Sequence, residues 1–530
     1  MCKGIGHFMH SRPHNRPYQQ WWPLPFLLYA LLRLPAWFEP HWYTDEAGYS
    51  TVAHEVMSGK LLYVNAWNNK PPIMIWAVAL TEHLFGTSEA SLHLLTFVSG
   101  LIALTLAFWF THRVFGPRTA LLVSLATALL IGLPITDAEL LVPESLLIAP
   151  QALAGVLILL AVTNRLPERV SPAVALVCAG VAVGMEIGLQ QTGLADLAAW
   201  TIVLVCVSPR PWSWTAGFLG GAGAVTMAWA IPTLYLVGWT RTSFALAKFY
   251  IAYTTSALPA TRVGTMEHLA GLGLVAGAII VLALLIRRTF RPDTISPLVA
   301  LWAIFNLAVP AAAHQPYPHF LTPVIIPTTL LISAVASEFR RIPRWVMTVG
   351  VIGFIASGWM ARVTGADWVS FTKGSFYGFP YRGLTTYYGG FVALTIHTQT
   401  WDEWSSSFDP RSVADQRVAT WIRSNGYQGT PAVVWSSDSW LYLVADLPVL
   451  LPTPPIYNDF VLLGSPKKVV ATIGAMAPRL VITEYDTLQA YPQIRTLLAH
   501  RYHVVYRAYP DTVYARDATR PASPNVPSAA

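Results

Sequence analysis

Long apolar runs separated by short polar stretches dominate the chain up to about residue 360. One helical crossing of a bilayer needs about 20 apolar residues, so runs near this length predict transmembrane helices. With their ends placed where Arg, Lys, Pro and Gly collect, the pattern predicts eleven spans, at 21–39, 91–111, 119–136, 146–163, 173–188, 194–207, 213–237, 269–286, 296–310, 320–337 and 345–360. The two short spans at 173–207 leave a re-entrant pair as an alternative. The run at 73–84 is too short to cross and is predicted to lie in the interface or to re-enter.

The pattern changes after Pro410, where shorter segments typical of a small soluble α/β unit begin. AVVW and RLVITEY predict buried strands, ADQRVATWIRSNG and KKVVATIGAMA predict amphipathic helices, and VVYRAY with TVYARD predicts a closing hairpin. The segment before this unit has a loop-like pattern rich in Phe, Trp and Tyr, rings that stack on sugars or, as we favour here, anchor at headgroup depth. We therefore predict a mainly α, polytopic membrane protein with these parts: a transmembrane module over 1–360 with a first outer loop at 40–90, an aromatic-rich outer linker over 361–409, an α/β domain over 410–517 and a disordered tail over 518–530.

Composition agrees with a membrane location. Of the 530 residues, 54% are apolar and only 12% are charged, and the mean hydropathy is +0.47, which is too apolar for a soluble enzyme. The net charge of +7 comes from short basic clusters between the apolar runs. Because these clusters form no continuous basic face, we predict no nucleic-acid partner. The three cysteines have no spacing that would indicate a disulfide framework or a metal site.

The basic clusters also predict the orientation of the chain. With the N-terminus in the cytoplasm, the inner loops hold fourteen Lys and Arg residues and the outer loops before residue 361 hold five. Cytoplasmic loops carry the excess of basic residues in membrane proteins. The first outer loop and the C-terminal α/β domain are therefore predicted to be extracytoplasmic, in a multi-pass protein of the cell inner membrane.

Polar residues gather at the predicted outer ends of several spans. Asp45 and Glu46 follow the first span directly, and Lys70 begins the turn KPP before the next apolar run. An acidic stretch between the third and fourth spans contains Glu139, and His319 precedes the tenth span. Charges at a bilayer edge are unfavourable and are usually functional. Each group taken singly also has a structural interpretation, as a hydrogen-bonded residue at a helix end.

The segments TDEAGY, NNKPPIMIW and LFGTSEAS, followed by ELLVPE, GLQQTG and PYPHFLTPVIIP, resemble the GT-C superfamily of polyprenyl-phosphate-sugar-dependent glycosyltransferases. The similarity covers most of the chain and points to the family 39-like branch, which is related to protein O-mannosyltransferases and lipid A aminoarabinose transferases. It implies that a sugar moves from a lipid phosphate to an acceptor at the outer face, with Asp45 as the catalytic residue. The chain departs from the family at Gln190, where a Lys is frequent, and at Asn69, where an acidic residue is frequent.

The predicted outer location leads to the same chemistry. Nucleotide sugars are absent there, so the donor must be carried by a lipid, and its phosphate leaving group needs cations or hydrogen-bond donors near the bilayer edge. The candidates for this role are Lys70, Arg241, Lys248 and His319. The acceptor hydroxyl needs a carboxylate base, and the candidates are Asp45, Glu46 and Glu139.

The sequence leaves the cofactor and the function class open. If a divalent cation takes part, oxygen ligands from Asp45 and Glu139 would suit Mg²⁺ or Mn²⁺. The favoured function is an inverting glycosyltransferase that uses a polyprenyl-phosphate-linked sugar and an envelope glycan, lipid or protein as acceptor. The alternative is a transporter or flippase of a lipid-linked glycan. No inverted repeat is visible, and the polar groups concentrate at one face of the membrane, which favours the transferase.

Overall fold

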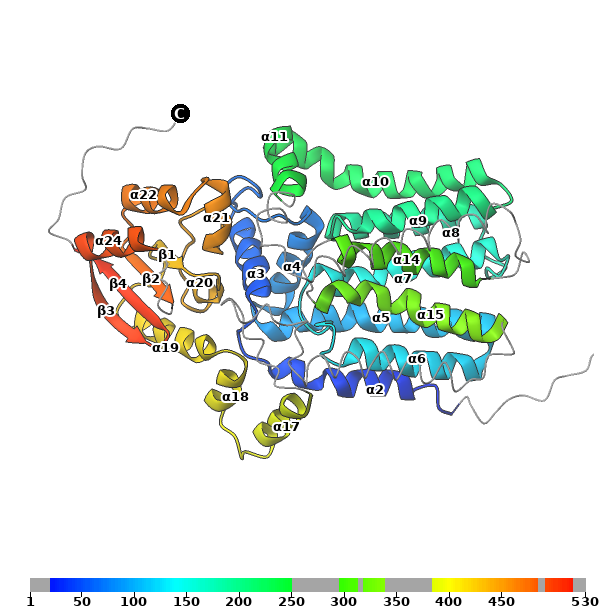
Figure 1. Ribbon diagram of the computed structural model, residues 1–530, viewed down its shortest axis with the longest axis horizontal. Helices are drawn as coiled ribbons and strands as arrows, with labels where there is room; N and C mark the ends of the chain where they lie inside the picture. Colours follow the sequence, from blue (N-terminus) through cyan, green and yellow to red (C-terminus); the bar gives the residue numbers. More distant parts are fainter. Residues whose placement is uncertain (1–19, 250–294, 313–317, 339–383, 485–490, 518–530) are drawn as a thin grey trace, which may run out of the picture.

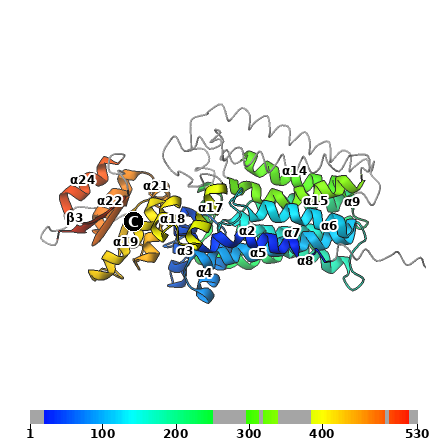
Figure 2. The ribbon, with the colours of Figure 1, turned by 90° about the horizontal axis from the view of Figure 1, so that it is seen from below.

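The computed structural model describes residues 20–249, 295–312, 318–338, 384–484 and 491–517. A bundle of long helices forms one end of the molecule, and an α/β domain made from the C-terminal part of the chain forms the other (Figure 1). The helices α3 (Thr44–Met57) and α4 (Pro72–Phe85) lie between these two parts. Figure 2 shows the same order from a perpendicular direction.

The helices of the bundle follow the apolar runs. They are α2 (Leu24–Arg33), α5 (Glu89–Phe115), α6 (Pro117–Gly132), α7 (Pro143–Val162), α8 (Pro172–Leu189), α9 (Gly193–Val207), α10 (Pro211–Val237), α14 (Ser296–Ala312) and α15 (Thr322–Glu338). Several of them begin with proline. Proline suits the first turn because its missing N–H would have no partner there, and its φ angle is already helical. The prolines in the sequence therefore mark where these helices start.

The multi-pass prediction agrees with the lengths of these helices. Within the described residues, five helices are long and apolar enough to cross a membrane, and they coincide with the predicted spans at 91–111, 146–163, 173–188, 213–237 and 320–337. The predicted spans at 21–39, 119–136, 194–207 and 296–310 coincide with apolar helices of 10–17 residues. The remaining two, at 269–286 and 345–360, lie outside the described residues. The total of eleven spans stays a prediction.

Close packing holds the bundle together. The indole rings of Trp200 on α9 and Trp302 on α14 lie fully buried with centroids 4.9 Å apart. Helices α8 and α10 approach so closely that a Cβ atom on Gly180 would lie 1.9 Å from the carbonyl oxygen of Phe218. Small residues allow such contacts between transmembrane helices, where lipid gives no hydrophobic driving force for association. Gly180 is therefore required at this crossing.

The first outer loop is mostly helical. The short helix η1 (Leu34–Phe38) precedes it, at the end of the predicted first span, and the loop itself contains α3 and α4. Helix α4 covers the run that is too short to span, and it packs against α3, α5 and α8. Its predicted interfacial or re-entrant position stays a prediction.

The expectation of a loop over residues 384–408 is wrong. This part of the linker forms α17 (Leu384–Thr395) and α18 (Trp401–Phe408), and a capping box between Thr400 and Glu403 starts the second helix. The rings of Tyr387, Trp404 and Phe408 are buried in a cluster with aromatic residues of the first outer loop. These aromatic residues therefore pack in the protein interior, which explains why a helix forms where the composition indicated an interfacial loop.

The C-terminal region contains the predicted strands and hairpin. Strands β1 (Ala432–Trp435) and β2 (Leu480–Glu484) are parallel, and β3 (Tyr502–Ala508) and β4 (Asp511–Arg516) form an antiparallel hairpin. The order in the sheet is β1-β2-β4-β3. The accompanying helices are α19 (Pro410–Ser424), α20 (Trp440–Val444), α21 (Ile456–Leu462), α22 (Pro466–Met476) and α24 (Pro492–Arg501). The predicted tail at 518–530 lies outside the described residues.

The α/β domain contacts the first outer loop directly. The Thr51 hydroxyl on α3 donates to the Ser439 carbonyl at 3.3 Å, and the Lys60 ammonium donates to the Val449 carbonyl at 2.9 Å. Both parts must therefore lie on the same side of the membrane, as the distribution of basic residues predicts.

We predict that this common side is extracytoplasmic. A single cysteine at the exposed position Asn425 of the α/β domain, introduced into a cysteine-free chain, should react with a membrane-impermeant thiol reagent in spheroplasts. A cysteine at Arg169, between α7 and α8 at the opposite end of the bundle, should react only after lysis. The reverse labelling pattern would invert the topology.

Candidate active site

The first turn of α3 carries the two acidic residues Asp45 and Glu46. Carboxylates are favourable at this position because they complement the positive end of the helix dipole. Adjacent residues on a helix point about 100° apart. Glu46 is fully buried, whereas Asp45 is partly exposed. The two carboxyl groups therefore contact different residues and can have different roles.

Glu46 attaches α3 to the bundle. Its Oε1 accepts the backbone N–H of Leu141 and contacts Nε2 of His93 on α5 at 3.0 Å, and Nδ1 of His93 contacts the carbonyl oxygen of Ala36. Since Nδ1 must donate to this carbonyl, a hydrogen bond at Nε2 needs a second proton, held by His93 or by Glu46. The arrangement is a buried pair that shares one proton, and it gives Glu46 a positioning role in this structure.

Asp45 lies among groups of both charges. Burial raises the pKa of its carboxyl group, and the charges of Lys70 and His319 oppose this rise. The carboxylate of Glu144, at the start of α7, acts in the other direction. A carboxyl group whose pKa is raised by burial, and whose ionised form nearby cations favour, is suited to accept a proton. The structure thus brings together three residues that the sequence predicted for the site.

The turn before α4 places Lys70. Tyr63 has a φ angle of 66°, in the left-handed region that is rare for a residue with a side chain, and its hydroxyl donates to the Lys70 carbonyl at 2.6 Å. The Lys70 N–H donates to the Asn68 side-chain oxygen at 3.0 Å. Gln191 donates to the carbonyl oxygen of Asn69 at 2.9 Å. The backbone on both sides of Lys70 is therefore fixed, while its side chain is half-buried.

His319 lies in the short helix η3 (Pro318–Leu321), which leads into α15. Its Nδ1 is 3.7 Å from a carboxylate oxygen of Asp137, a fully buried residue with a φ angle of 52° in the loop before α7. Gln190, at the end of α8, donates to Glu144 Oε1 at 3.0 Å. The site selection from sequence included neither Asp137 nor Glu144, although both lie in the acidic stretch that it singled out. Their contacts join distant parts of the chain, so the local pattern marked the acidic stretch but not these two members of it.

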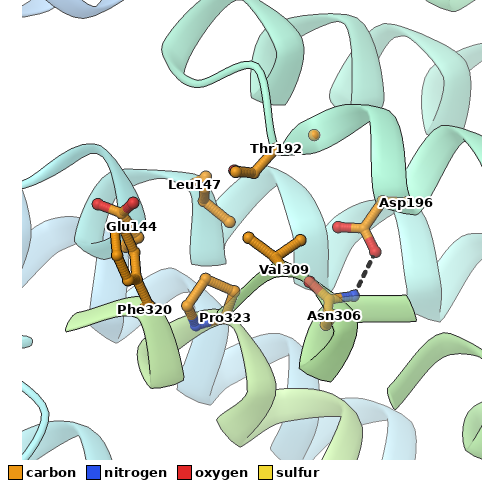
Figure 3. Close-up of a pocket in the computed structure, with 9 residues that line it drawn as sticks. Glu144, Leu147, Thr192, Asp196, Asn306, Val309, Phe320 and Pro323 are labelled. Atoms are coloured by element: carbon orange, nitrogen blue, oxygen red, sulfur yellow. Dashed lines mark hydrogen bonds between the residues drawn. The ribbon is translucent and has the colours of Figure 1, made fainter. Parts of the chain in front are cut away.

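A pocket adjoins this cluster inside the bundle (Figure 3). Glu144, Thr192, Asp196 and Asn306 supply its polar lining, and the remaining lining residues are Leu147, Gly193, Val309, Phe320 and Pro323. Asp196 accepts hydrogen bonds from Asn306 at 2.7 Å and from the Trp302 indole at 2.6 Å. The pocket is small, and Glu144 and Asp196 lie on opposite sides of it with apolar side chains between them (Figure 3).

Glu139 meets a different set of charges. Its carbonyl oxygen accepts hydrogen bonds from Arg33 at 3.2 Å and Thr96 at 2.9 Å, which tie the loop to α2 and α5. Burial, together with the charges of Asp137 and Glu39, raises the pKa of its carboxyl group to about 8. At neutral pH this carboxyl group is mainly protonated, so it is less suited than Asp45 to act as a base.

Glu39 is a further member of this neighbourhood that the sequence analysis did not identify. It accepts the Tyr387 hydroxyl at 2.6 Å and the Trp42 indole N–H at 3.0 Å. The Tyr387 bond spans most of the chain, so only the folded structure shows it.

The other two predicted phosphate ligands are exposed side chains. Arg241 is on α11 (Trp239–Ser243) and Lys248 ends η2 (Phe244–Lys248), and both side chains are exposed. Among the described residues, the cations whose charges act on Asp45 are Lys70 and His319. A role for Arg241 and Lys248 in binding the donor stays a prediction.

The predicted metal ligands Asp45 and Glu139 have different charged neighbours. Lys70 and His319 act most strongly on Asp45, whereas Asp137 and Glu39 act most strongly on Glu139. A Mg²⁺ or Mn²⁺ ion held by these two carboxylates stays a prediction.

Comparison with solved structures identifies the fold. Over 94% of its length the chain matches the crystal structure of ArnT from Cupriavidus metallidurans bound to undecaprenyl phosphate, with a TM-score of 0.62, 18% sequence identity and coverage of 99% of that protein. The apo state of the same protein matches with a TM-score of 0.59 and 17% identity, covering 94% of this chain and 98% of that one. The chain has a GT-C fold. The GT-C resemblance predicted from sequence is thus confirmed for the fold.

A weaker similarity, with a TM-score of 0.48 and 12% identity, relates 96% of the chain to 75% of the Archaeoglobus fulgidus oligosaccharyltransferase in its apo form. No protein-family model matches the sequence, and no curated protein matches it.

Proposed function

We propose that the protein is an inverting glycosyltransferase that moves a sugar from a polyprenyl phosphate to an envelope glycan, lipid or protein at the extracytoplasmic face of the inner membrane. The observation that carries this proposal is that the charges of Lys70 and His319 act on Asp45, which begins α3, the helix that lies between the α/β domain and the helical bundle. The match to a GT-C protein bound to undecaprenyl phosphate supports a lipid-phosphate donor.

The proposed reaction is a single displacement. The acceptor hydroxyl attacks the anomeric carbon of the donor sugar and loses its proton to the Asp45 carboxylate. The bond between this carbon and the phosphate oxygen breaks, and its electron pair leaves with the polyprenyl phosphate. Attack from the face opposite to the leaving group inverts the anomeric configuration.

Lys70 and His319 are proposed to bind the leaving phosphate. A positively charged group next to the phosphate stabilises the negative charge that develops as the sugar leaves. Gln190, which stands where the family frequently has a Lys, donates to Glu144 and adds no positive charge. Lys70 and His319 therefore carry a larger share of phosphate binding in this chain. Arg241 and Lys248 are exposed and stay candidates for weaker contacts with the lipid headgroup.

Asp45→Asn should reduce turnover at least about a hundredfold, because it keeps the shape of the side chain and removes the proton acceptor. The assay uses purified protein, a panel of polyprenyl phosphates that carry radiolabelled sugars, and membranes of a strain without the protein as the source of acceptor. Label should move into a glycan, lipid or protein fraction with inverted configuration.

Asp402→Asn is the matched control, since Asp402 is an exposed carboxylate on α18. Unchanged turnover in Asp45→Asn would remove Asp45 as the base. Movement of labelled lipid across vesicles without transfer of the sugar would instead support the flippase alternative.

Replacing Lys70 or His319 by Ala should raise the KM for the labelled lipid donor by about 10- to 100-fold, the usual effect of losing a hydrogen bond to a charged group. The same replacement at the exposed Arg241 or Lys248 should change this KM by less than about threefold. Steady-state kinetics with the donor as the varied substrate tests both statements. A larger effect at Arg241 or Lys248 than at Lys70 would assign the phosphate to the outer helices.

A further inference from the structure

Three buried carboxylates converge in the α/β domain, away from the candidate active site. Asp415 lies on α19, Glu484 ends β2 and Asp511 begins β4, and each is at most 2% exposed. One carboxylate oxygen from each residue lies within 4.8 Å of the other two. Burial of this kind is very unfavourable for ionised groups unless a partner compensates their charge.

The strand register makes this arrangement more unfavourable. Glu484 and Asp511 are direct partners in the antiparallel pairing of β2 with β4. Like charges directly opposite each other destabilise a sheet. Asp415 adds a third carboxyl group from the helix that covers the same end of the sheet. The fold therefore brings three acidic residues together at a buried site where apolar side chains would be more favourable.

The nearest cation compensates only part of this charge. The Arg411 guanidinium donates to Asp409 at 2.6 Å and to Glu484 Oε2 at 3.3 Å, and it lies 3.8 Å from Asp438. One guanidinium thus serves several carboxylates.

The remaining oxygens point to a missing positive partner. Within the part of the chain that the structure describes, no hydrogen-bond donor reaches either carboxylate oxygen of Asp415 or Asp511. Asp415 and Asp511 can hydrogen-bond to each other only if one of them holds a proton. Either retained protons or a bound cation must neutralise the cluster.

We propose that Asp415, Glu484 and Asp511 bind a divalent cation, and that this cation is Ca²⁺. An all-oxygen set of carboxylates suits hard cations. Oxygens that share one Ca²⁺ lie at most twice the Ca–O distance apart, roughly 4.6–5.2 Å, whereas the limit for Mg²⁺ is roughly 4.2 Å. All three carboxylate oxygens lie within 4.8 Å of one another, which is within the reach of one Ca²⁺ ion, and the flexible coordination of Ca²⁺ tolerates unequal separations better than the near-ideal octahedron of Mg²⁺. Bidentate binding and water molecules would complete the six to eight ligands that Ca²⁺ takes.

The cation site borders the contact between the α/β domain and the helix that carries Asp45. Asp438, next to Arg411, accepts the Trp440 backbone N–H at 2.9 Å, and the Trp440 indole donates to the Tyr43 carbonyl at 3.2 Å. Tyr43 is the residue that precedes α3. The ion would therefore stabilise the segment from Asp438 to Trp440, which contacts the residue before α3. This role does not depend on the reaction that the protein catalyses.

Calcium binding to the purified full-length protein tests this inference. After treatment with a chelator and desalting, a CaCl₂ titration should raise the midpoint of thermal unfolding until the site is saturated. At a free Ca²⁺ concentration 100 times the Kd, the unfolding equilibrium constant should fall about 100-fold. Mg²⁺ at the same concentration should have a smaller effect. Elemental mass spectrometry should find one bound calcium per chain that the chelator removes.

Variants locate the ion. Asp511→Asn, or Asp415→Asn as a second variant that leaves the sheet unaltered, should lose that equivalent of calcium and the response to CaCl₂. Asp402→Asn, at the exposed surface carboxylate, and Asp45→Asn, in the candidate active site, should keep both. A wild-type protein that neither binds calcium nor responds to CaCl₂ would overturn the proposal, as would equal binding by Asp511→Asn. A wild-type protein without any calcium response, together with stabilisation by Asp511→Asn, would show that the carboxyl groups share protons instead.

Discussion

The buried pair between Glu46 and His93 is the interaction on which the candidate site depends. It joins the first turn of α3 to α5, and through His93 to the carbonyl of Ala36 at the end of the first span. Removing one member of such a pair leaves an uncompensated buried group and destabilises a protein by about 3–5 kcal/mol. With Glu46 held in this way, the rotation of α3 is fixed, so Asp45 must project toward Lys70 and His319. The more deeply buried carboxylate thus determines where the more exposed one acts.

The α/β domain supports the same helix from the other side. Trp440 contacts the residue before α3, and the hydroxyl of Thr51 bonds to Ser439. The first outer loop is therefore held between the membrane helices and a soluble domain, and its strained turn at Tyr63 keeps Lys70 in place. A polar loop of this size needs both supports, because its own helices are short and bury little apolar surface by themselves.

The sequence predicted the features that depend on local pattern. Apolar runs located the helices of the bundle and alternating segments located the strands. The first-loop motif selected Asp45 and Lys70, and the predicted outer end of the tenth span selected His319. The sequence did not predict the contacts around these residues. The hydrogen bonds of Glu144 with Gln190, of Glu46 with His93 and of Tyr387 with Glu39 join segments far apart in the chain. Composition misled at 384–408, where aromatic residues typical of an interface pack as a buried cluster. The carboxylates of the proposed calcium site likewise come together only through the register of β2 and β4.

The pH dependence of turnover tests most directly whether Asp45 is a base held ionised by its neighbours. Because the charge of Lys70 lowers the pKa of Asp45, we predict that Lys70→Met moves the acidic limb of the kcat profile, measured at saturating donor, to higher pH. Lys60→Met is the matched control, since Lys60 pairs with Glu55 and bonds to Val449 in the same loop. The acidic limb of the Lys60→Met kcat profile should lie at the same pH as that of the wild type. An acidic limb that does not move in Lys70→Met would contradict the assignment of Asp45 as the base that Lys70 controls.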